Sequence, residues 1–229
     1  MVSHKLYKPL RLLILGAPGS GKGTQTSRLL KRFPQLNSIS SGDMLRQQIK
    51  EGTKLGSLAA SYVLNGELLP DNLITRVVVS HLDQTGWLVP SANWLLDGFP
   101  RTAEQAKMLG GELSKVHCNL NLVVELDVPH DIILKRIENR FVHIPSGRIY
   151  NLEYNPPKVP GKDDVTGEPL SKRPDDNPEV FSKRLREYAR TMAPLREFYA
   201  MKDILKTVSG ETSDIIFPKL CKLIEEGKY

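Results

Sequence analysis

The chain has 229 residues, of which 40% are hydrophobic and 25% are charged, and its formal net charge is +6. This composition is ordinary for a globular protein, and the length suits one α/β domain with insertions better than two independent domains. No apolar stretch approaches the roughly 20 residues of a membrane-spanning helix, so we expect no insertion into a membrane.

Apolar runs alternate with helical periods along most of the chain. The first run, 10–15, leads into a glycine-rich loop, 16–24, and a helix over 25–33. Further strands are predicted at 37–40, 94–96, 120–128 and 206–209. Further helices are predicted at 41–50, with Ser41 or Asp43 as the cap, at 54–64 and at 71–84. Others are predicted from Thr102 onward, at 129–140, at 179–198 with a disturbance at Pro194, and at 213–226. Strands that alternate with helices predict a parallel sheet covered on both faces, with ligands at the carboxyl ends of the strands.

The segment from Phe141 to Pro178 differs from the rest of the chain in composition and pattern, because it is rich in proline and has no helical period. Two short alternating runs, 142–144 and 148–150, flank Pro145-Ser146-Gly147 and predict a β-hairpin. This segment is expected to be a β-rich insert in the α/β domain.

The loop Gly16-Ala-Pro-Gly-Ser-Gly-Lys-Gly-Thr24 is the strongest signal for chemistry. Glycines let backbone N–H groups turn toward a β-phosphate, the following helix adds positive potential at its N-terminus, and Lys22 can bridge the β- and γ-phosphates. The alternative is a plain glycine turn with a solvated lysine. Gly23 stands where most such loops carry a serine or threonine that binds magnesium.

A second motif, Asp97-Gly-Phe-Pro-Arg101, follows the strand predicted at 94–96. An aspartate in this place can hold a hydrated Mg²⁺ beside phosphates, and Arg101 can form a fork to a phosphate. The alternative is an aspartate in a turn and an arginine on the surface.

Arginines recur near the ends of the predicted elements: Arg46, Arg101, Arg136, Arg140, Arg173 and Arg184. Arg136 and Arg140, at i and i+4, are expected on one helix face, and Arg186 and Arg190 are expected to face solvent. A triphosphate and a monophosphate repel each other, so fixed cations from several elements suit phosphoryl transfer between them. The basic residues stand singly rather than in one run, and an anionic small ligand accounts for them as well as a nucleic acid would.

The motifs together, with Ser41-Gly-Asp-Met-Leu-Arg46 and the run from Asn155 to Asp176, resemble adenylate kinases of the long-lid form. The resemblance implies one P-loop kinase domain, 1–229, with a core of 1–39, 70–139 and 178–229. It also implies a helical AMP-binding segment at 40–69 and a β-rich lid at 140–177. Gly23 fits this family, in which magnesium is held largely through water.

The resemblance also implies roles for individual residues. The acceptor AMP would be bound by Ser41, Arg46, Leu69, Gly98, Arg101, Gln105, Arg173 and Arg184. Transfer would be served by Lys22, Arg140, Arg173, Arg184 and Asp97, the last positioning hydrated Mg²⁺ without a direct protein ligand. The donor triphosphate would be bound by Gly19, Ser20, Gly21, Lys22, Gly23, Thr24, Arg136, Tyr150 and Gly210.

The β-rich insert carries His143, Ser146, Asp163 and Thr166 at positions that bind zinc in some members of the family. Serine and threonine are poor zinc ligands and no cysteine is nearby, so we expect a hydrogen-bonded polar cluster and no zinc.

Fewer positions of the sequence bear on the identity of the donor and on the cellular compartment. Ser41, the run Ser209-Gly-Glu-Thr212 and Ile216-Phe-Pro218 resemble the mitochondrial branch of the family, which prefers GTP as donor. The first acidic residue is Asp43, and this acid-poor start resembles mitochondrial targeting segments. We therefore expect a monomer of the mitochondrial matrix that uses GTP and AMP; the alternative is a cytosolic enzyme that uses ATP and AMP. A GTP-switched binding protein is disfavoured, because the chain has no Asn-Lys-x-Asp motif.

Overall fold

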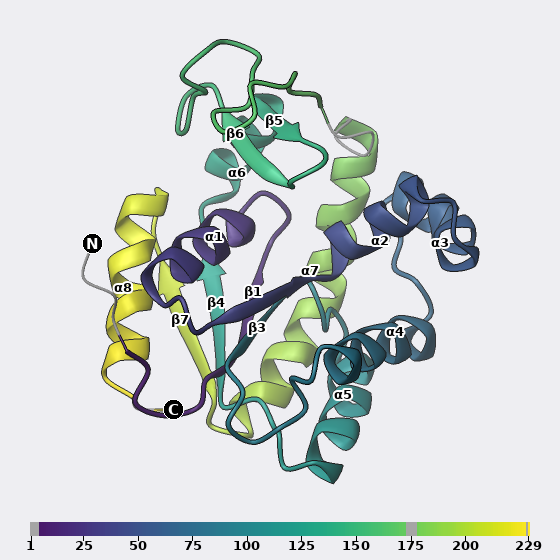
Figure 1. Cartoon of the computed structure of the whole chain (residues 1–229), viewed down its shortest axis with the longest axis vertical. Coiled ribbons are helices and arrows are strands. Elements are labelled where there is room, and N and C mark those ends of the chain that lie inside the picture. Colours follow the sequence, from purple (N-terminus) through teal and green to yellow (C-terminus); the bar gives the residue numbers. More distant parts are fainter. Residues whose placement is uncertain (1–4, 173–177, 228) are drawn as a thin grey trace.

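The computed structural model describes residues 5–172, 178–227 and 229. In this part of the chain, five parallel strands form the central sheet, in the order β2-β3-β1-β4-β7 (Figure 1). Their bounds are β1 (Arg11–Gly16), β2 (Asn37–Ser40), β3 (Trp94–Asp97), β4 (Leu122–Asp127) and β7 (Leu205–Ser209). Ile14 of β1 and Ser40 of β2 both pair with Asp97, so the ends of these strands meet at one edge of the sheet.

Helices cover both faces of the sheet (Figure 1). They are α1 (Lys22–Arg32), α2 (Ser41–Lys50), α3 (Lys54–Asn65), α4 (Asp71–Gln84), α5 (Ala103–Lys115), α6 (His130–Glu138), α7 (Pro178–Ala200) and α8 (Ser213–Glu225). Alternate residues of β1 point to opposite faces. Leu12 belongs to the core shared with α1 and α8, and Leu13 to the core shared with α4, α5 and α7. The predicted three-layer α/β fold is confirmed.

The β-rich insert forms a second, antiparallel sheet at one end of the molecule (Figure 1). It consists of β5 (Arg140–His143) and β6 (Arg148–Asn151), with Phe141 paired to Tyr150. The predicted hairpin is therefore present, and Ile144 lies in its turn rather than in a strand.

Helices α2 and α3 pack closely against each other at Gly56. A Cβ on this glycine would lie 2.0 Å from the Gln48 carbonyl oxygen, so a larger residue would force the two helices apart. Thr53 caps α3 by accepting a hydrogen bond from the Gly56 N–H, and Gly66 ends the helix in the left-handed conformation.

Three local expectations were wrong. Helix α1 begins at Lys22 rather than at residue 25, because Gly21 takes the left-handed cap position directly before it. Ser40 caps α2, where Ser41 or Asp43 was expected, and its side chain accepts from the Asp43 N–H.

The third correction concerns Arg140, which does not share a helix face with Arg136. Helix α6 ends at Glu138, Asn139 leaves the helical conformation, and Arg140 pairs with Asn151 as the first residue of β5. Pairing between the two strands of the insert thus overrides the helical period.

Helix α7 continues past Pro194 to Ala200. Within the described residues, the search for a helix of the length and apolarity needed to cross a membrane found none.

Candidate active site

The loop between β1 and α1 depends on its glycines. Gly19 and Gly21 have φ angles of +84° and +92°, a region that L-residues with a Cβ avoid. A Cβ on Gly19 would lie 2.9 Å from the Ile137 side chain, and one on Gly16 would lie 2.6 Å from the Ser20 hydroxyl. Conformation and space therefore both require glycine, and the loop leads its backbone into the N-terminus of α1.

Lys22 folds back over this loop. Its Nζ donates hydrogen bonds to the carbonyl oxygens of Gly16 at 2.8 Å and Ala17 at 3.0 Å. Burial lowers the pKa of Lys22 to about 8; Asp97 raises it in part, and Arg101, Arg184 and Arg140 lower it further. Four basic side chains from four elements therefore share one electrostatic environment with the Asp97 carboxylate, and this suits a highly anionic ligand.

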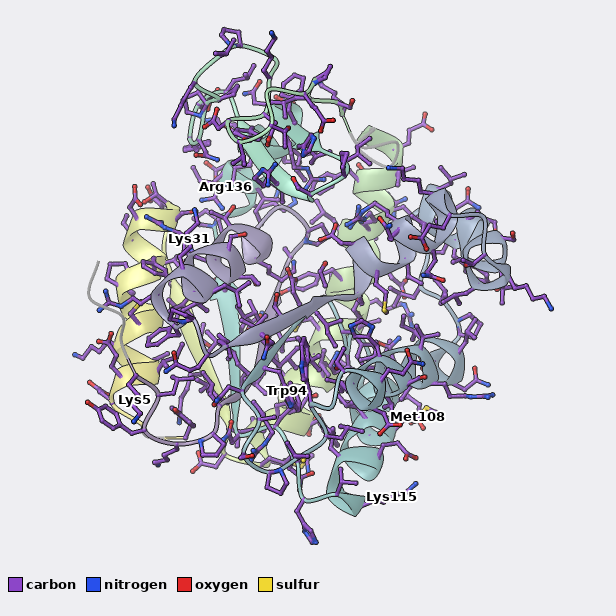
Figure 2. All side chains as sticks on the ribbon, viewed as in Figure 1. Lys5, Lys31, Trp94, Met108, Lys115 and Arg136 are labelled. Atoms are coloured by element: carbon purple, nitrogen blue, oxygen red, sulfur yellow. The ribbon has the colours of Figure 1, made fainter. Side chains whose placement is uncertain are left out.

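Arg136 joins the loop to the insert and to the segment that follows β7. Its guanidinium donates to the Ser20 carbonyl at 3.1 Å and to the Glu211 carbonyl at 2.6 Å. It also lies over the ring of Tyr154 in the insert, 5.6 Å from the centroid. Arg136 lies below the β5–β6 sheet and close to α1 in Figure 2, so it connects the insert, the loop and the segment that follows β7. In that segment, the Gly210 N–H donates a hydrogen bond to the Asp127 carbonyl oxygen.

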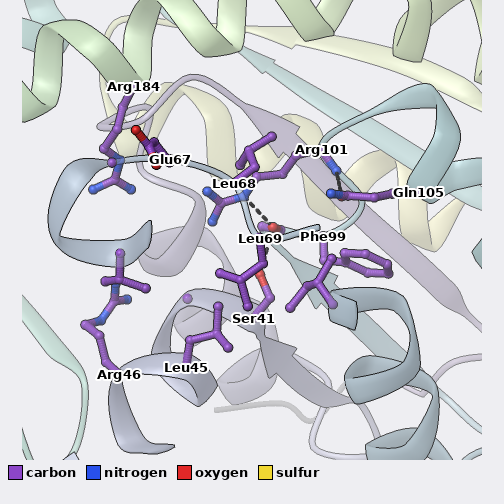
Figure 3. Close-up of a pocket in the computed structure, with 15 residues that line it drawn as sticks. Ser41, Leu45, Arg46, Glu67, Leu68, Leu69, Phe99, Arg101, Gln105 and Arg184 are labelled. Atoms are coloured by element: carbon purple, nitrogen blue, oxygen red, sulfur yellow. Dashed lines mark hydrogen bonds between the residues drawn. The ribbon is translucent and has the colours of Figure 1, made fainter. Parts of the chain in front are cut away.

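A pocket opens beside the carboxyl ends of β2 and β3 (Figure 3). Its walls come from α2, from the connection between α3 and α4, from the segment after β3, and from α7. The lining residues are Ser41, Gly42, Leu45, Arg46, Val63, Gly66, Glu67, Leu68, Leu69, Ile74, Gly98, Phe99, Arg101, Gln105 and Arg184. In Figure 3, Arg46 and Arg184 lie toward one end of this pocket and Gln105 lies toward the other.

Hydrogen bonds fix the polar side chains of the pocket. Ser41 Oγ donates to the Gly98 carbonyl at 2.7 Å, and Arg101 Nε donates to the same oxygen at 2.6 Å. Gly98 has a φ of +79°, and a Cβ there would lie 3.2 Å from both Ser41 Oγ and Arg101 Nη2. Arg46 forms an ion pair with Asp43 at 2.5 Å.

Gln105 is the most deeply buried of the polar groups at the other end. Its side-chain oxygen accepts from the Arg101 N–H at 2.7 Å, and its amide nitrogen donates to Asp71 Oδ1 at 2.8 Å. Thr102 caps α5 through the Gln105 N–H, so the residue is held at the backbone as well.

The pocket and the phosphate loop meet at two arginines. Arg101 and Arg184 line the pocket, and both act electrostatically on Lys22 in the loop. Asp97 lies at the same junction: it is 8% exposed, and its Oδ2 lies 3.8 Å from the place of a Cβ on Gly23.

The predicted polar cluster of the insert is present. His143 Nδ1 lies 2.7 Å from Ser146 Oγ, and Thr166 Oγ1 donates to Asp163 at 2.9 Å. Hydrogen bonds from Arg148 hold the pKa of the buried Asp163 well below its ordinary range. No group of three or more His, Cys, Asp or Glu side chains suited to a metal ion occurs among the described residues.

The structure brings some of the predicted site residues together and separates others. The acceptor residues Ser41, Arg46, Leu69, Gly98, Arg101, Gln105 and Arg184 line one pocket. The donor residues from Gly19 to Thr24 lie in the loop and the first turn of α1. The Tyr150 hydroxyl instead donates to Asp163 in the interior of the insert, at 2.8 Å. Arg173 lies outside the described residues.

Sequence reasoning missed several supporting contacts. Asp71 was expected only as part of a helix start, and nothing local indicates its bond to Gln105, 34 residues away. Glu125, buried in β4, accepts from Arg196 at 2.8 Å and from the Tyr188 hydroxyl at 3.3 Å, which ties α7 to the sheet. A charged residue inside an apolar strand was the available signal for Glu125.

Comparison with known proteins gives close relatives over nearly the whole chain. A family model described as adenylate kinase matches residues 14–204. A Saccharomyces cerevisiae protein named "GTP:AMP phosphotransferase, mitochondrial" is 66% identical over 97% of this chain and 95% of its own length. A Drosophila melanogaster protein of the same name is 42% identical over 93% of this chain and 94% of its own length. A Thermodesulfovibrio yellowstonii protein named "Adenylate kinase" is 42% identical over 95% of this chain and 100% of its own length.

Proposed function

This chain belongs to the adenylate kinase family, and we propose that it transfers the γ-phosphoryl group of GTP to AMP, which gives GDP and ADP. The observation that carries this proposal is the double position of Arg101 and Arg184. Both line the acceptor pocket and both act on Lys22 in the phosphate loop. One set of cations can therefore serve two anionic substrates that must come into contact.

The choice of GTP as donor is supported by relatives rather than by geometry. The yeast relative at 66% identity and the Drosophila relative at 42% identity both have GTP:AMP phosphotransferase in their names. ATP is the second candidate, because the bacterial relative at 42% identity is named adenylate kinase. The same yeast and Drosophila names support the mitochondrial matrix as the compartment.

The proposed reaction is a direct in-line displacement. An oxygen of the AMP phosphate attacks the γ-phosphorus of GTP, and the bond from that phosphorus to the β–γ bridging oxygen breaks, so the electron pair leaves with GDP. Lys22, Arg140 and Arg184 would offset the charge on the transferred group; we assign Arg173 to the same task from the family resemblance. Positioning and electrostatics supply the catalysis, without a covalent enzyme intermediate.

Water must be kept from the transferred group, and we propose that residues 40–69 and 140–177 close over the substrates. The hairpin of the insert already lies near both halves of the site. Ile149 Cδ1 lies 3.4 Å from the place of a Cβ on Gly23, and Asp43 Oδ2 lies 3.9 Å from that on Gly147.

Magnesium accompanies the nucleoside triphosphate in this class of reaction, where it neutralises charge on the β- and γ-phosphates. The residues fit such an ion: Asp97 presents a buried carboxylate toward the first turn of α1, and Mg²⁺ prefers oxygen ligands and keeps several waters. We propose that Asp97 holds the hydrated ion through water and that the chain acts as a monomer.

The donor assay tests this function directly. Purified full-length chain is given AMP and magnesium with GTP, ITP or ATP, and nucleoside diphosphates are quantified by chromatography. We expect GTP and ITP, which share the 6-oxo group and the N1–H, to exceed ATP in kcat/KM by at least about tenfold. Preference for ATP would overturn the donor assignment, and no phosphorylation of AMP with any donor would overturn the function.

A further inference from the structure

We propose that Asp71 is a positioning residue that fixes the side-chain amide of Gln105 and so sets the base preference of the acceptor pocket. This inference rests on the proposed function, in that it takes the pocket to hold a nucleoside monophosphate with its base toward Gln105. Asp71 itself is not among the residues that line the pocket, and it would act only through Gln105.

The contacts of Gln105 leave its amide one orientation. The side chain is 2% exposed, its oxygen accepts from the Arg101 backbone N–H at 2.7 Å, and its nitrogen donates to Asp71 at 2.8 Å. A backbone N–H can only donate and an ionised carboxylate can only accept. If the amide turned over, two donors would face each other at Arg101 and two acceptors would face each other at Asp71.

Hydrogen-bond capacity then determines what the amide offers the ligand. A glutamine amide has two donor hydrogens and two acceptor lone pairs, and Arg101 and Asp71 use one of each. One acceptor and one donor remain, in a fixed order. Adenine presents a 6-amino donor beside the N1 acceptor, whereas hypoxanthine and guanine present a 6-oxo acceptor beside an N1–H donor.

A base held in one place therefore pairs with one amide orientation only. The orientation that suits adenine places the amide oxygen opposite the 6-amino group, and the reversed orientation suits the 6-oxopurines. Asp71 makes the reversal costly, because a hydrogen bond to a charged partner is stronger than a neutral one and a buried acceptor without a donor is destabilising. We infer that the bond from Asp71 contributes to rejection of IMP and GMP.

A purely structural role for Asp71 makes a different prediction. Asp71 is the first residue of α4, where a carboxylate stabilises the N-terminal end of a helix whatever the pocket holds. Helix α6 offers a matched control, since it also follows a proline cap, and the exposed Asp131 lies in its first turn.

The experiment measures kcat/KM for AMP and for IMP with saturating GTP and magnesium, in wild type, Asp71→Asn and Asp131→Asn. An asparagine can donate as well as accept, so it removes the restraint that Asp71 places on the orientation of Gln105 and leaves the restraint from the Arg101 N–H. We expect the AMP-to-IMP ratio to fall about tenfold in Asp71→Asn, with most of the change in KM, and to stay unchanged in Asp131→Asn. Asp71→Glu, which keeps an obligate acceptor, should recover part of the ratio.

Thermal unfolding of each variant separates selectivity from stability. Should Asp71→Asn fail to fold, Asp71→Ser replaces it, because serine suits a helix N-terminus and its hydroxyl can also donate or accept. An unchanged AMP-to-IMP ratio in the folded variant would overturn the role of Asp71 while wild-type activity on AMP stands. Failure of wild type to phosphorylate AMP would instead overturn the proposed function.

Discussion

The phosphate loop takes its residues from one contiguous stretch, 16–24, whereas the acceptor pocket collects side chains from α2, α7 and the segment after β3. The two regions also differ in the hydrogen-bond partners of their polar side chains. Lys22 bonds only to carbonyl oxygens of its own loop, and the buried Ser20 hydroxyl has no hydrogen-bond partner within the described residues. In the pocket, Ser41 and Gln105 are held by partners far along the chain.

This difference shows that a local motif can shape a loop through backbone conformation, whereas the pocket depends on long-range contacts. It follows that changes in the loop should act on the chemical step and on the donor, while changes in the pocket should act on the acceptor.

Replacement of Lys22 should give the largest loss. Lys22→Met removes a cation that we propose offsets the charge on the transferred group, so we expect kcat to fall by about 10²–10³ or more. The affinity for AMP, measured by calorimetry, should stay within about twofold. Lys31→Met, on the exposed last turn of the same helix, is the matched control. Near-normal turnover in Lys22→Met would remove the loop from the chemistry.

Substitution at Gly98 should act on the acceptor alone. Gly98→Ala forces a left-handed φ of +79° on a residue with a Cβ and crowds Ser41 and Arg101 at 3.2 Å. The conformational cost alone is roughly 1–2 kcal/mol, so we expect the KM for AMP to rise about thirtyfold while the KM for GTP stays near wild type.

The control for Gly98 is Gly110→Ala. A Cβ on Gly110 meets nothing within 4 Å, and helix α5 should gain stability from alanine. An unchanged KM for AMP in Gly98→Ala would show that the junction after β3 does not shape the acceptor site.

Substitution of Arg136 tests whether a change beside the loop acts on the donor rather than on the acceptor. Arg136→Met removes the bonds to the Ser20 and Glu211 carbonyls, which hold the loop beside the segment after β7. We expect the KM for GTP to rise about tenfold, and the KM for AMP to change little. Lys135→Met, exposed on the same helix, should match wild type. A larger rise in the KM for AMP than in the KM for GTP would show that the loop and the pocket do not act on separate substrates.

The smallest effect is a pH dependence of donor binding. Without nucleotide the pKa of Lys22 is about 8, and the phosphates of GTP should raise it on binding. Binding then takes up a proton above pH 8, so affinity is full below that value and is lost as the pH rises through it. From pH 7.5 to 8.5 we expect the association constant of magnesium-GTP to fall about threefold, measured by calorimetry in two buffers. Lys22→Met should abolish the fall.

Much of the fold could be predicted because its signals are local. The predicted bounds of β2 and α4 coincide with the structure, since a proline and a change of period mark them. The start of α2 was predicted wrongly, because Ser41 and Asp43 were taken as the possible caps and Ser40, which the backbone conformation selects, was not considered. Arg140 was misplaced because its strand forms through pairing with β6, which lies further along the chain.

The same limit applies to the site. The family resemblance brought out most of the polar residues that line the pocket, but it could not show that Asp71 reaches Gln105 or that Glu125 holds α7. Those bonds join segments that come together only after the sheet forms, and no pattern within either segment requires them.

We propose that the donor and acceptor sites adjoin at Arg101, Arg184 and Lys22. A single molecule with guanosine and adenosine joined by five phosphates tests it directly, because it should fill both sites at once. We expect calorimetry to give a dissociation constant at least about a hundredfold lower than that of GTP or AMP alone. The linked molecule should also compete with both substrates. Binding no tighter than that of GTP, with competition against only one substrate, would contradict the account.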